Sequence, residues 1–244
     1  MARELADVLH HFLGDPLSGE RLGPASLALL SEPEDAFAVA VAWNLAHELA
    51  RQGLAVAWVT ALADEELLPP DATPGLTRLL APAQDLSGLS RAVSEASAKL
   101  AASPAPGLVL VRVPPGWIAP GPAAGRVLAW TLQIVGPDLE PRGRAISIAR
   151  RVLAACRTAR LGAVMHEVRS VREAERAFTA LARECAERSE GRLASYGVLL
   201  DDAELYRSLI ARRPLALLRP EARAARAVAD VASLLRSDFA CDVG

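Results

Sequence analysis

The chain has 244 residues, of which 52% are hydrophobic, 4% aromatic and 23% charged, and its formal net charge is −2. This length suits one large α/β domain with an aliphatic core, and the balanced charge gives no support for nucleic-acid binding. Three separated cysteines without a CxxC pair, no signal-peptide pattern and no apolar run of spanning length predict a soluble, cytoplasmic protein.

The first part of the chain contains a leader and a βαβ unit. Residues 1–20 are predicted to form an N-terminal leader, either packed on the domain or free to bind a partner. Residues 26–31 form a continuous apolar run of the buried-strand type, 36–52 have the composition of an apolar helix that ends at Gly53, and 54–60 form a second apolar strand. These segments predict one parallel βαβ unit.

The remaining segments continue the alternation of strands and helices. Prolines 69, 70, 74 and 82 indicate an irregular connection. Strands are expected at 107–113, 131–135, 161–168 and 194–200, a short extended piece at 214–218, and helices at 85–101, 122–130, 143–158, 171–188, 201–212 and from Pro220 onward. The pattern predicts an α/β fold with a doubly wound, mostly parallel sheet flanked by helices, in one domain over 21–238 with a tail at 239–244. That tail is short and acidic, so no membrane anchor is predicted.

The turn after the first strand has an unusual composition for a phosphate-binding loop. Glycines, a lysine and a Ser/Thr hydroxyl hold nucleoside triphosphate and Mg²⁺ in such loops. This turn instead carries Glu32, Glu34 and Asp35 and lacks glycine and lysine, and the only lysine of the chain is Lys99. A triphosphate placed here would meet like charge.

Two interpretations of the three acids stay open. They can cap the helix that begins at residue 36 and complement its dipole. Alternatively, they can mimic a bound phosphate and hold the domain in a shape that resembles the nucleotide-bound one. The same electrostatics serve both interpretations.

Read from end to end, the sequence resembles the MinD/ParA family of deviant P-loop ATPases, and most closely its flagellar-number regulators, FlhG and FleN. The family pattern SGKGGVGKT aligns without a gap with nine residues: Ser31, Glu32, Pro33, Glu34, Asp35, Ala36, Phe37, Ala38 and Val39. Residues 42–46 (AWNLA) then resemble the VNLA box, 168–174 a VRSxxEA turn, 196–202 the YLGYIPEDP strand end and 212–215 the RRRPV segment. The resemblance covers about residues 22–236 and implies a P-loop NTPase fold of the MinD type.

The family's functional positions hold residues of other kinds in this sequence. In this alignment Pro33 stands where the family has its signature lysine, Ala38 where it has the phosphate-binding lysine and Val39 where it has the Mg²⁺-binding Thr. The resemblance also implies that the strand-end carboxylates are replaced by Thr60, Leu62 and Arg112, and the Asn near the base by His166. Phosphoryl transfer depends on positioning and on charge neutralisation by such groups. Their joint replacement predicts a pseudo-ATPase with no catalytic residues, no metal site and no cofactor.

Three hypotheses follow from these patterns. The first is a non-catalytic regulatory or protein-interaction module in the spatial organisation or assembly of flagella or another polar structure, with an active MinD/ParA-type ATPase or a second copy as partner. The second is an atypical ATPase that binds ATP and Mg²⁺ with help from a partner. The third is a RecA-like relative, which would show another strand order and an antiparallel hairpin near the C-terminus.

Overall fold

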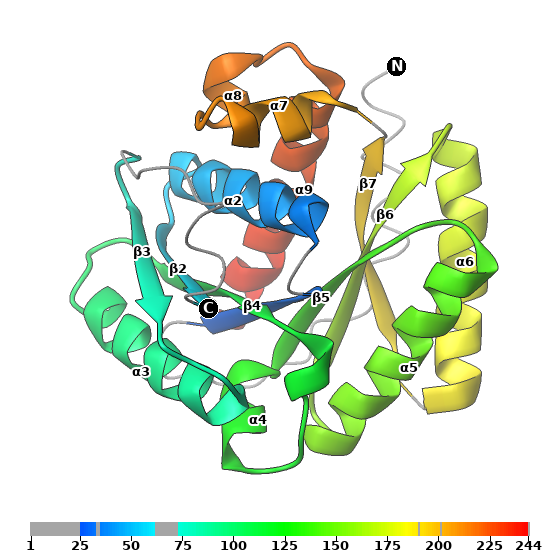
Figure 1. The fold of residues 1–244 in the computed structure, drawn as a ribbon, viewed down its shortest axis with the longest axis horizontal. Helices are drawn as coiled ribbons and strands as arrows, with labels where there is room; N and C mark the ends of the chain where they lie inside the picture. Colours follow the sequence, from blue (N-terminus) through cyan, green and yellow to red (C-terminus); the bar gives the residue numbers. More distant parts are fainter. Residues whose placement is uncertain (1–24, 33–34, 62–72, 190, 201, 244) are drawn as a thin grey trace.

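A seven-stranded sheet forms the centre of the molecule (Figure 1), and the computed structural model describes residues 25–32, 35–61, 73–189, 191–200 and 202–243. The strand order is β3-β2-β4-β1-β5-β6-β7, and every pair is parallel. The strands are β1 (Ala25–Leu30), β2 (Ala55–Ala61), β3 (Leu76–Ala81), β4 (Gly107–Val113), β5 (Trp130–Val135), β6 (Arg160–Val168) and β7 (Leu193–Leu200). The predicted doubly wound parallel sheet is confirmed. The antiparallel hairpin expected of a RecA-like relative does not occur in these residues.

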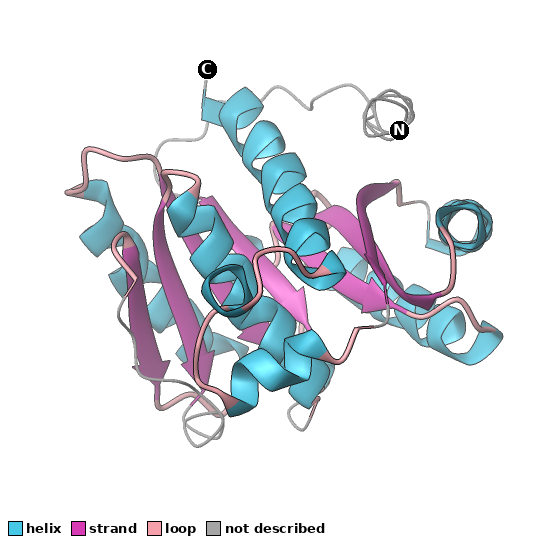
Figure 2. Cartoon of the chain, turned by 90° about the horizontal axis from the view of Figure 1, so that it is seen from above, coloured by secondary structure: helices cyan, strands magenta, loops and turns pink. Residues whose placement is uncertain are grey.

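Helices cover both faces of the sheet (Figure 2). One face packs against α2 (Ala36–Arg51) and α9 (Arg223–Val243), with α7 (Glu204–Ile210) and α8 (Leu215–Leu218) lying against α2. The other face packs against α3 (Leu86–Ala101), α4 (Pro122–Val127), α5 (Leu139–Ala155) and α6 (Val171–Ser189), and a 3-10 turn, η3 (Pro115–Trp117), follows β4.

Alternation along β1 shows why both faces are covered. Leu27 and Leu29 belong to the core beneath α2 and α9, whereas Ala28 and Leu30 belong to the core on the opposite face. Successive side chains of a strand point to opposite faces, so a strand that is buried at every residue requires two covering layers. Helix α2 is buried at every residue from Ala38 to Ala50 because the sheet, α9 and α7 enclose it. It ends at Arg51, one residue before the predicted 52, and the φ of 95° at Gly53 suits a residue just after a helix.

Two sets of hydrogen bonds hold α7 and α8 against α2, and α9 against the sheet. Asn44 of α2 donates to Ser208 Oγ of α7 (2.9 Å) and accepts from the backbone N of Leu215 in α8 (2.6 Å). At the other end of the sheet, Tyr196 of β7 donates to Asp238 of α9 (2.6 Å) and accepts from Trp130 Nε1 of β5 (3.1 Å). Each contact joins residues far apart in the sequence, so the tertiary arrangement depends on it.

Several sequence-based boundaries were wrong. Residues 76–81 of the supposed irregular connection form the edge strand β3, and 214–218 contribute the short helix α8 instead of an extended piece. Helix α5 begins at Leu139, before the predicted 143, because proline is tolerated in the first turn and Pro141 does not interrupt it. Helix α9 begins after Pro220, at Arg223, and continues through 239–243, the segment assigned to a tail, where Phe239 is buried. The leader at 1–20 lies outside the described residues.

None of the helices in the described ranges is long and apolar enough to cross a membrane.

A buried histidine on α2 gives a test of the packing between α2 and the segment before β3. His47 is 5% exposed, contacts the hydroxyl of Thr73 through Nδ1 and meets the edge of the Trp43 ring. Burial lowers the pKa of His47 from 6.5 to about 4. The unfolded chain therefore binds the proton first as the pH falls, so stability present at neutral pH is lost between about 6.5 and 4.

We expect this histidine alone to lower the free energy of unfolding by roughly 2 kcal/mol between pH 7 and pH 5. Urea unfolding of the natural chain and of His47→Gln at both pH values measures the difference. The variant should lose less stability on acidification, and equal losses would contradict the assignment.

Candidate functional site

The candidate site lies at the carboxyl end of β1, which sits between β4 and β5. The connection from β1 leads through α2 to β2 on one side of it, and the connection from β4 leads through α4 to β5 on the other. Ligands of open parallel sheets bind in the crevice outside the strand ends where successive connections run in opposite directions. The residues after β1 therefore stand where this fold class places its ligands.

An arginine from the neighbouring strand enters the turn after β1. Arg112 of β4 pairs in register with Leu29 of β1, and its residue is only 3% exposed. Its Nε donates to Ser31 Oγ (3.1 Å) and its Nη2 donates to the carbonyl oxygen of Glu32 (2.9 Å). A buried guanidinium thus ties the turn to the sheet. The positive charge of Arg112 offsets part of the negative charge of the acids in the turn. The sequence of the turn does not reveal this charge, because Arg112 lies 80 residues further along the chain than Glu32.

The N-terminus of α2 is capped by the side chain of Asp35. Asp35 is the N-cap, and its Oδ1 accepts a hydrogen bond from the backbone N of Ala38 (2.9 Å). A carboxylate at this place satisfies a free amide and complements the positive end of the helix dipole. The capping interpretation is therefore confirmed for Asp35. Glu32 contributes its carbonyl oxygen, which also accepts from Asp35 N (3.2 Å), and Pro33 and Glu34 lie outside the described residues.

The first turn of α2 offers no oxygen ligands beyond Asp35. Ala36 and Phe37 are half-buried, and Ala38 and Val39 are fully buried in the core. Their hydrocarbon side chains lack donors and acceptors, so they can bind neither phosphate nor Mg²⁺.

Three rings contact one another beside the site. Phe37 lies against His166 at the end of β6, with ring centroids 4.8 Å apart and planes at 24°. Phe37 also meets Tyr206 of α7, with ring centroids 5.7 Å apart and ring planes tilted by 48°. Glu167, directly after His166, has a φ of 56°, and the pairing of β6 with β7 shifts its register between His166 and Val168. The chain end of β6 is thus bent where it meets α2.

The remaining predicted positions do not join this group. Thr60, near the end of β2, is fully buried, and its hydroxyl has no hydrogen-bond partner among the described residues. β2 is separated from β1 by β4, so Thr60 is away from the crevice. Leu62 lies outside the described residues.

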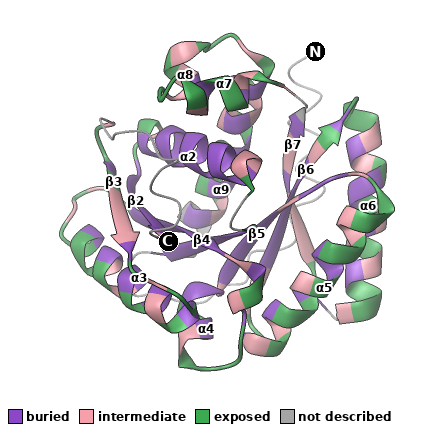
Figure 3. Ribbon diagram, viewed as in Figure 1, coloured by how far each residue is buried: buried purple, intermediate pink, exposed green. Residues whose placement is uncertain are grey.

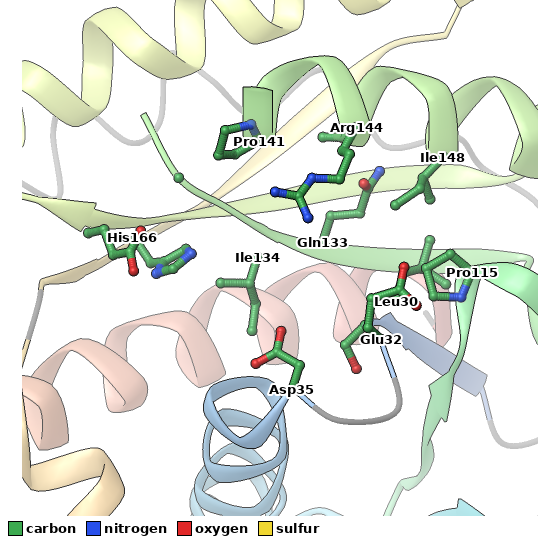
Figure 4. Close-up of a pocket in the computed structure, with 14 residues that line it drawn as sticks. Leu30, Glu32, Asp35, Pro115, Gln133, Ile134, Pro141, Arg144, Ile148 and His166 are labelled. Atoms are coloured by element: carbon green, nitrogen blue, oxygen red, sulfur yellow. The ribbon is translucent and has the colours of Figure 1, made fainter. Parts of the chain in front are cut away.

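A cavity of about 230 Å³ opens between the turn, β5, β6 and α5. Figure 4 shows Asp35 and Glu32 on one wall, with Arg144 and Gln133 on the α5 side. Sequence reasoning did not single out Gln133, although an amide in the mainly apolar strand 130–135 was a usable signal; Gln133 is 4% exposed. The cavity is lined by the acids Glu32, Asp35 and Glu167 and by the guanidinium of Arg144, so its lining suits a small dipolar group better than a multiply charged anion.

No cluster of three or more histidine, cysteine, aspartate or glutamate side chains within the described part of the chain is placed to hold a metal ion.

Comparisons with known proteins give structural matches only. No protein-family model matches the sequence, and no curated protein matches it. The cell division ATPase MinD of Pyrococcus furiosus is 16% identical and has a TM-score of 0.61, with 88% of this chain and 99% of that chain covered. The MinC:MinD complex of Aquifex aeolicus is 15% identical and has a TM-score of 0.59, with 87% of this chain and 96% of that chain covered. The ATP complex of McdA(D38A) from Cyanothece is 10% identical and has a TM-score of 0.60, with 90% of this chain and 98% of that chain covered.

These matches extend over nearly the whole of each relative, so the likeness concerns a complete domain and not a shared βαβ unit. At such low identity they establish the arrangement of the chain and leave its chemistry to be argued from its own residues. The chain has the fold of the MinD/ParA-type ATPases.

Proposed function

We propose that this protein is a non-catalytic member of the MinD/ParA-like group, a pseudo-ATPase that acts as a protein-interaction or regulatory module. Its role would lie in the spatial organisation or assembly of a cellular machine, such as flagella or another polar structure, as the resemblance to FlhG and FleN suggests. One observation carries the proposal: the protein's own groups take the places at the turn after β1 and at the start of α2 where phosphate would bind.

Electrostatics and hydrogen bonding support this proposal. Helix N-termini bind phosphate through free backbone amides and a favourable dipole. In this chain the carboxylate of Asp35 already bonds to the amide of Ala38 and carries the charge that phosphate would bring. Val39, aligned with the Mg²⁺-binding Thr, is buried and apolar. ATP and Mg²⁺ therefore do not fit the residues present.

A second candidate function keeps ATP binding. Arginine recognises phosphate well, and the guanidinium of Arg112 lies directly behind the turn. An atypical ATPase could use that cation together with groups from a partner. Two of the donors of Arg112 already bond to Ser31 and Glu32, so binding would require the turn to rearrange.

The partner in this proposal is a protein. Aquifex MinD was solved with MinC, which shows that a protein of this fold can associate with another protein. We propose an active MinD/ParA-type ATPase or a second copy of this chain as the partner, in the cytoplasm, with neither nucleic acid nor a stable membrane anchor involved.

Titration of the purified chain with a fluorescent ATP analogue and Mg²⁺, alongside a phosphate-release assay, tests the proposal. We expect no saturable binding at concentrations up to about 1 mM, equivalent to a binding free energy weaker than about −4 kcal/mol, and no turnover. An active ParA-type ATPase serves as positive control.

Micromolar binding would overturn the proposal. If Arg112→Leu, shown to be folded by circular dichroism, then abolished that binding, the second candidate function would replace it.

A further inference from the structure

Exposed apolar side chains gather on α7 and α8. Within the described residues, five large hydrophobic side chains are exposed, and three of them belong to these two short helices. Tyr206 is 44% exposed, Ile210 82% and Leu217 62%. Figure 3 shows both helices at the outer surface, beyond α2. We name these three residues the α7–α8 surface.

Ile210 and Leu217 are mostly exposed, whereas Tyr206 also contacts the ring of Phe37 in α2. Leu205 and Ser208 of α7 and Leu215 of α8 face inward and are at most 1% exposed. Tyr206 and Ile210 lie four residues apart and therefore share the opposite side of α7. Leucine and isoleucine at such positions expose apolar area to water at a cost that polar residues would avoid, which is typical of a binding surface.

The α7–α8 surface is held rigidly by the layer beneath it. Asn44 bonds to Ser208 of α7 and to the backbone N of Leu215 in α8. In the turn between the helices, the backbone N of Arg213 donates to the carbonyl of Ser208 (3.1 Å) and that of Arg212 to Leu209 (3.0 Å). A partner would therefore meet a formed surface and would not have to order it.

The charge around this surface is positive. Arg212 and Arg213 are exposed and form no salt bridge with any described residue, whereas Arg207 pairs with Glu204 and Arg219 with Glu221. Asp202, the remaining described acid of the segment, accepts from the backbone N of Glu204 and of Ala224. Two exposed guanidinium groups without a salt bridge to any described residue thus stand in the turn between Ile210 and Leu217.

We propose that the α7–α8 surface docks an acidic, amphipathic segment of a partner protein, with apolar side chains on Ile210 and Leu217 and carboxylates on Arg212 and Arg213. This inference deepens the proposed function by naming the surface and the chemistry of the partner, and it rests on that function only for its biological purpose.

Two other occupants fit less well. A symmetric dimer through this surface would bring the arginines of both copies together, which is unfavourable. Membrane-surface helices are longer, with an extended apolar face and many basic residues, whereas α7 has 7 residues and α8 has 4.

Selection from a display library of random helical peptides, with the full chain as bait, tests the proposal. We expect the enriched peptides to be rich in Glu and Asp and to carry apolar residues at helical spacing. The best peptide, labelled with a fluorophore, should bind Ile210→Ser/Leu217→Ser and Arg213→Glu at least about tenfold more weakly. Higher salt should weaken binding because the contact is partly ionic.

Matched controls come from elsewhere on the chain. Leu139→Ser removes an exposed apolar side chain of α5 (76% exposed), and Arg157→Glu reverses an exposed charge; both should bind the peptide as the natural chain does. Thermal unfolding shows whether each variant is folded.

Several results would overturn the inference: no enrichment, enrichment of basic or uncharged peptides, or equal loss of binding in the Leu139 control. Binding to anionic phosphatidylglycerol vesicles, or self-association in sedimentation, that disappears in Ile210→Ser/Leu217→Ser would assign the surface to a membrane or to a second copy instead. None of these results affects the ATP titration, so the two proposals fail separately.

Discussion

Asn44→Ala is expected to lower the free energy of unfolding by about 3 kcal/mol. The amide is 3% exposed and satisfies a hydroxyl on α7 and a backbone N–H on α8 at once. Alanine would leave both groups buried without that partner and would create a small cavity. Urea denaturation followed by circular dichroism measures the change.

Hydrogen exchange gives the Asn44 prediction a local readout, because the amide of Leu215 should lose protection first. Ser237→Ala is the matched control: it removes one exposed bond to the carbonyl of Ser233 and should change stability by less than about 0.5 kcal/mol. If Asn44→Ala cost no more than this control, the amide would not fasten α7 and α8 to α2.

Gly162→Ala should destabilise the protein by about 3 kcal/mol. A Cβ on this residue of β6 would lie 2.7 Å from Cδ2 of Tyr196 and closer still to Cε2. Tyr196 is 1% exposed and is held by Trp130 and Asp238, so its ring cannot move aside without breaking those bonds. The midpoint of thermal or urea unfolding reports the loss.

Gly143→Ala is the control for the same chemical change without the clash. Nothing lies within 4 Å of a Cβ at Gly143, inside helix α5, so alanine should stabilise the chain there by up to about 1 kcal/mol. Adding Tyr196→Leu to Gly162→Ala should cost less than the sum of the two single changes, since the smaller side chain relieves the contact. Strict additivity would contradict the proposed overlap.

Most strands of the sheet were predictable because their sequences are mainly apolar. β1, β2, β4, β5, β6 and β7 share this property, which buried parallel strands require. β3 was missed because an edge strand needs less apolar area, and Thr77 and Arg78 broke the pattern. α8, with 4 residues, is too short to show a helical period.

The candidate site was predictable only in part, for a physical reason. The unusual turn and its capping acid are local features, and Asp35 could be read from its place before the helix. The contact of Arg112 with Ser31 depends on β4 lying next to β1, and that of Phe37 with His166 on β6 lying near α2. Spacing along the chain does not reveal which strands become neighbours.

The edge position of β3 has a consequence for how the protein behaves at high concentration. A parallel sheet that ends in a strand with unpaired backbone groups offers a template on which another chain can polymerise. Pro74 and Pro82 bracket the six residues of β3, and proline has no amide hydrogen to extend the ladder. The prolines that concealed this strand in the sequence therefore also limit how far its hydrogen-bond ladder can extend at either end.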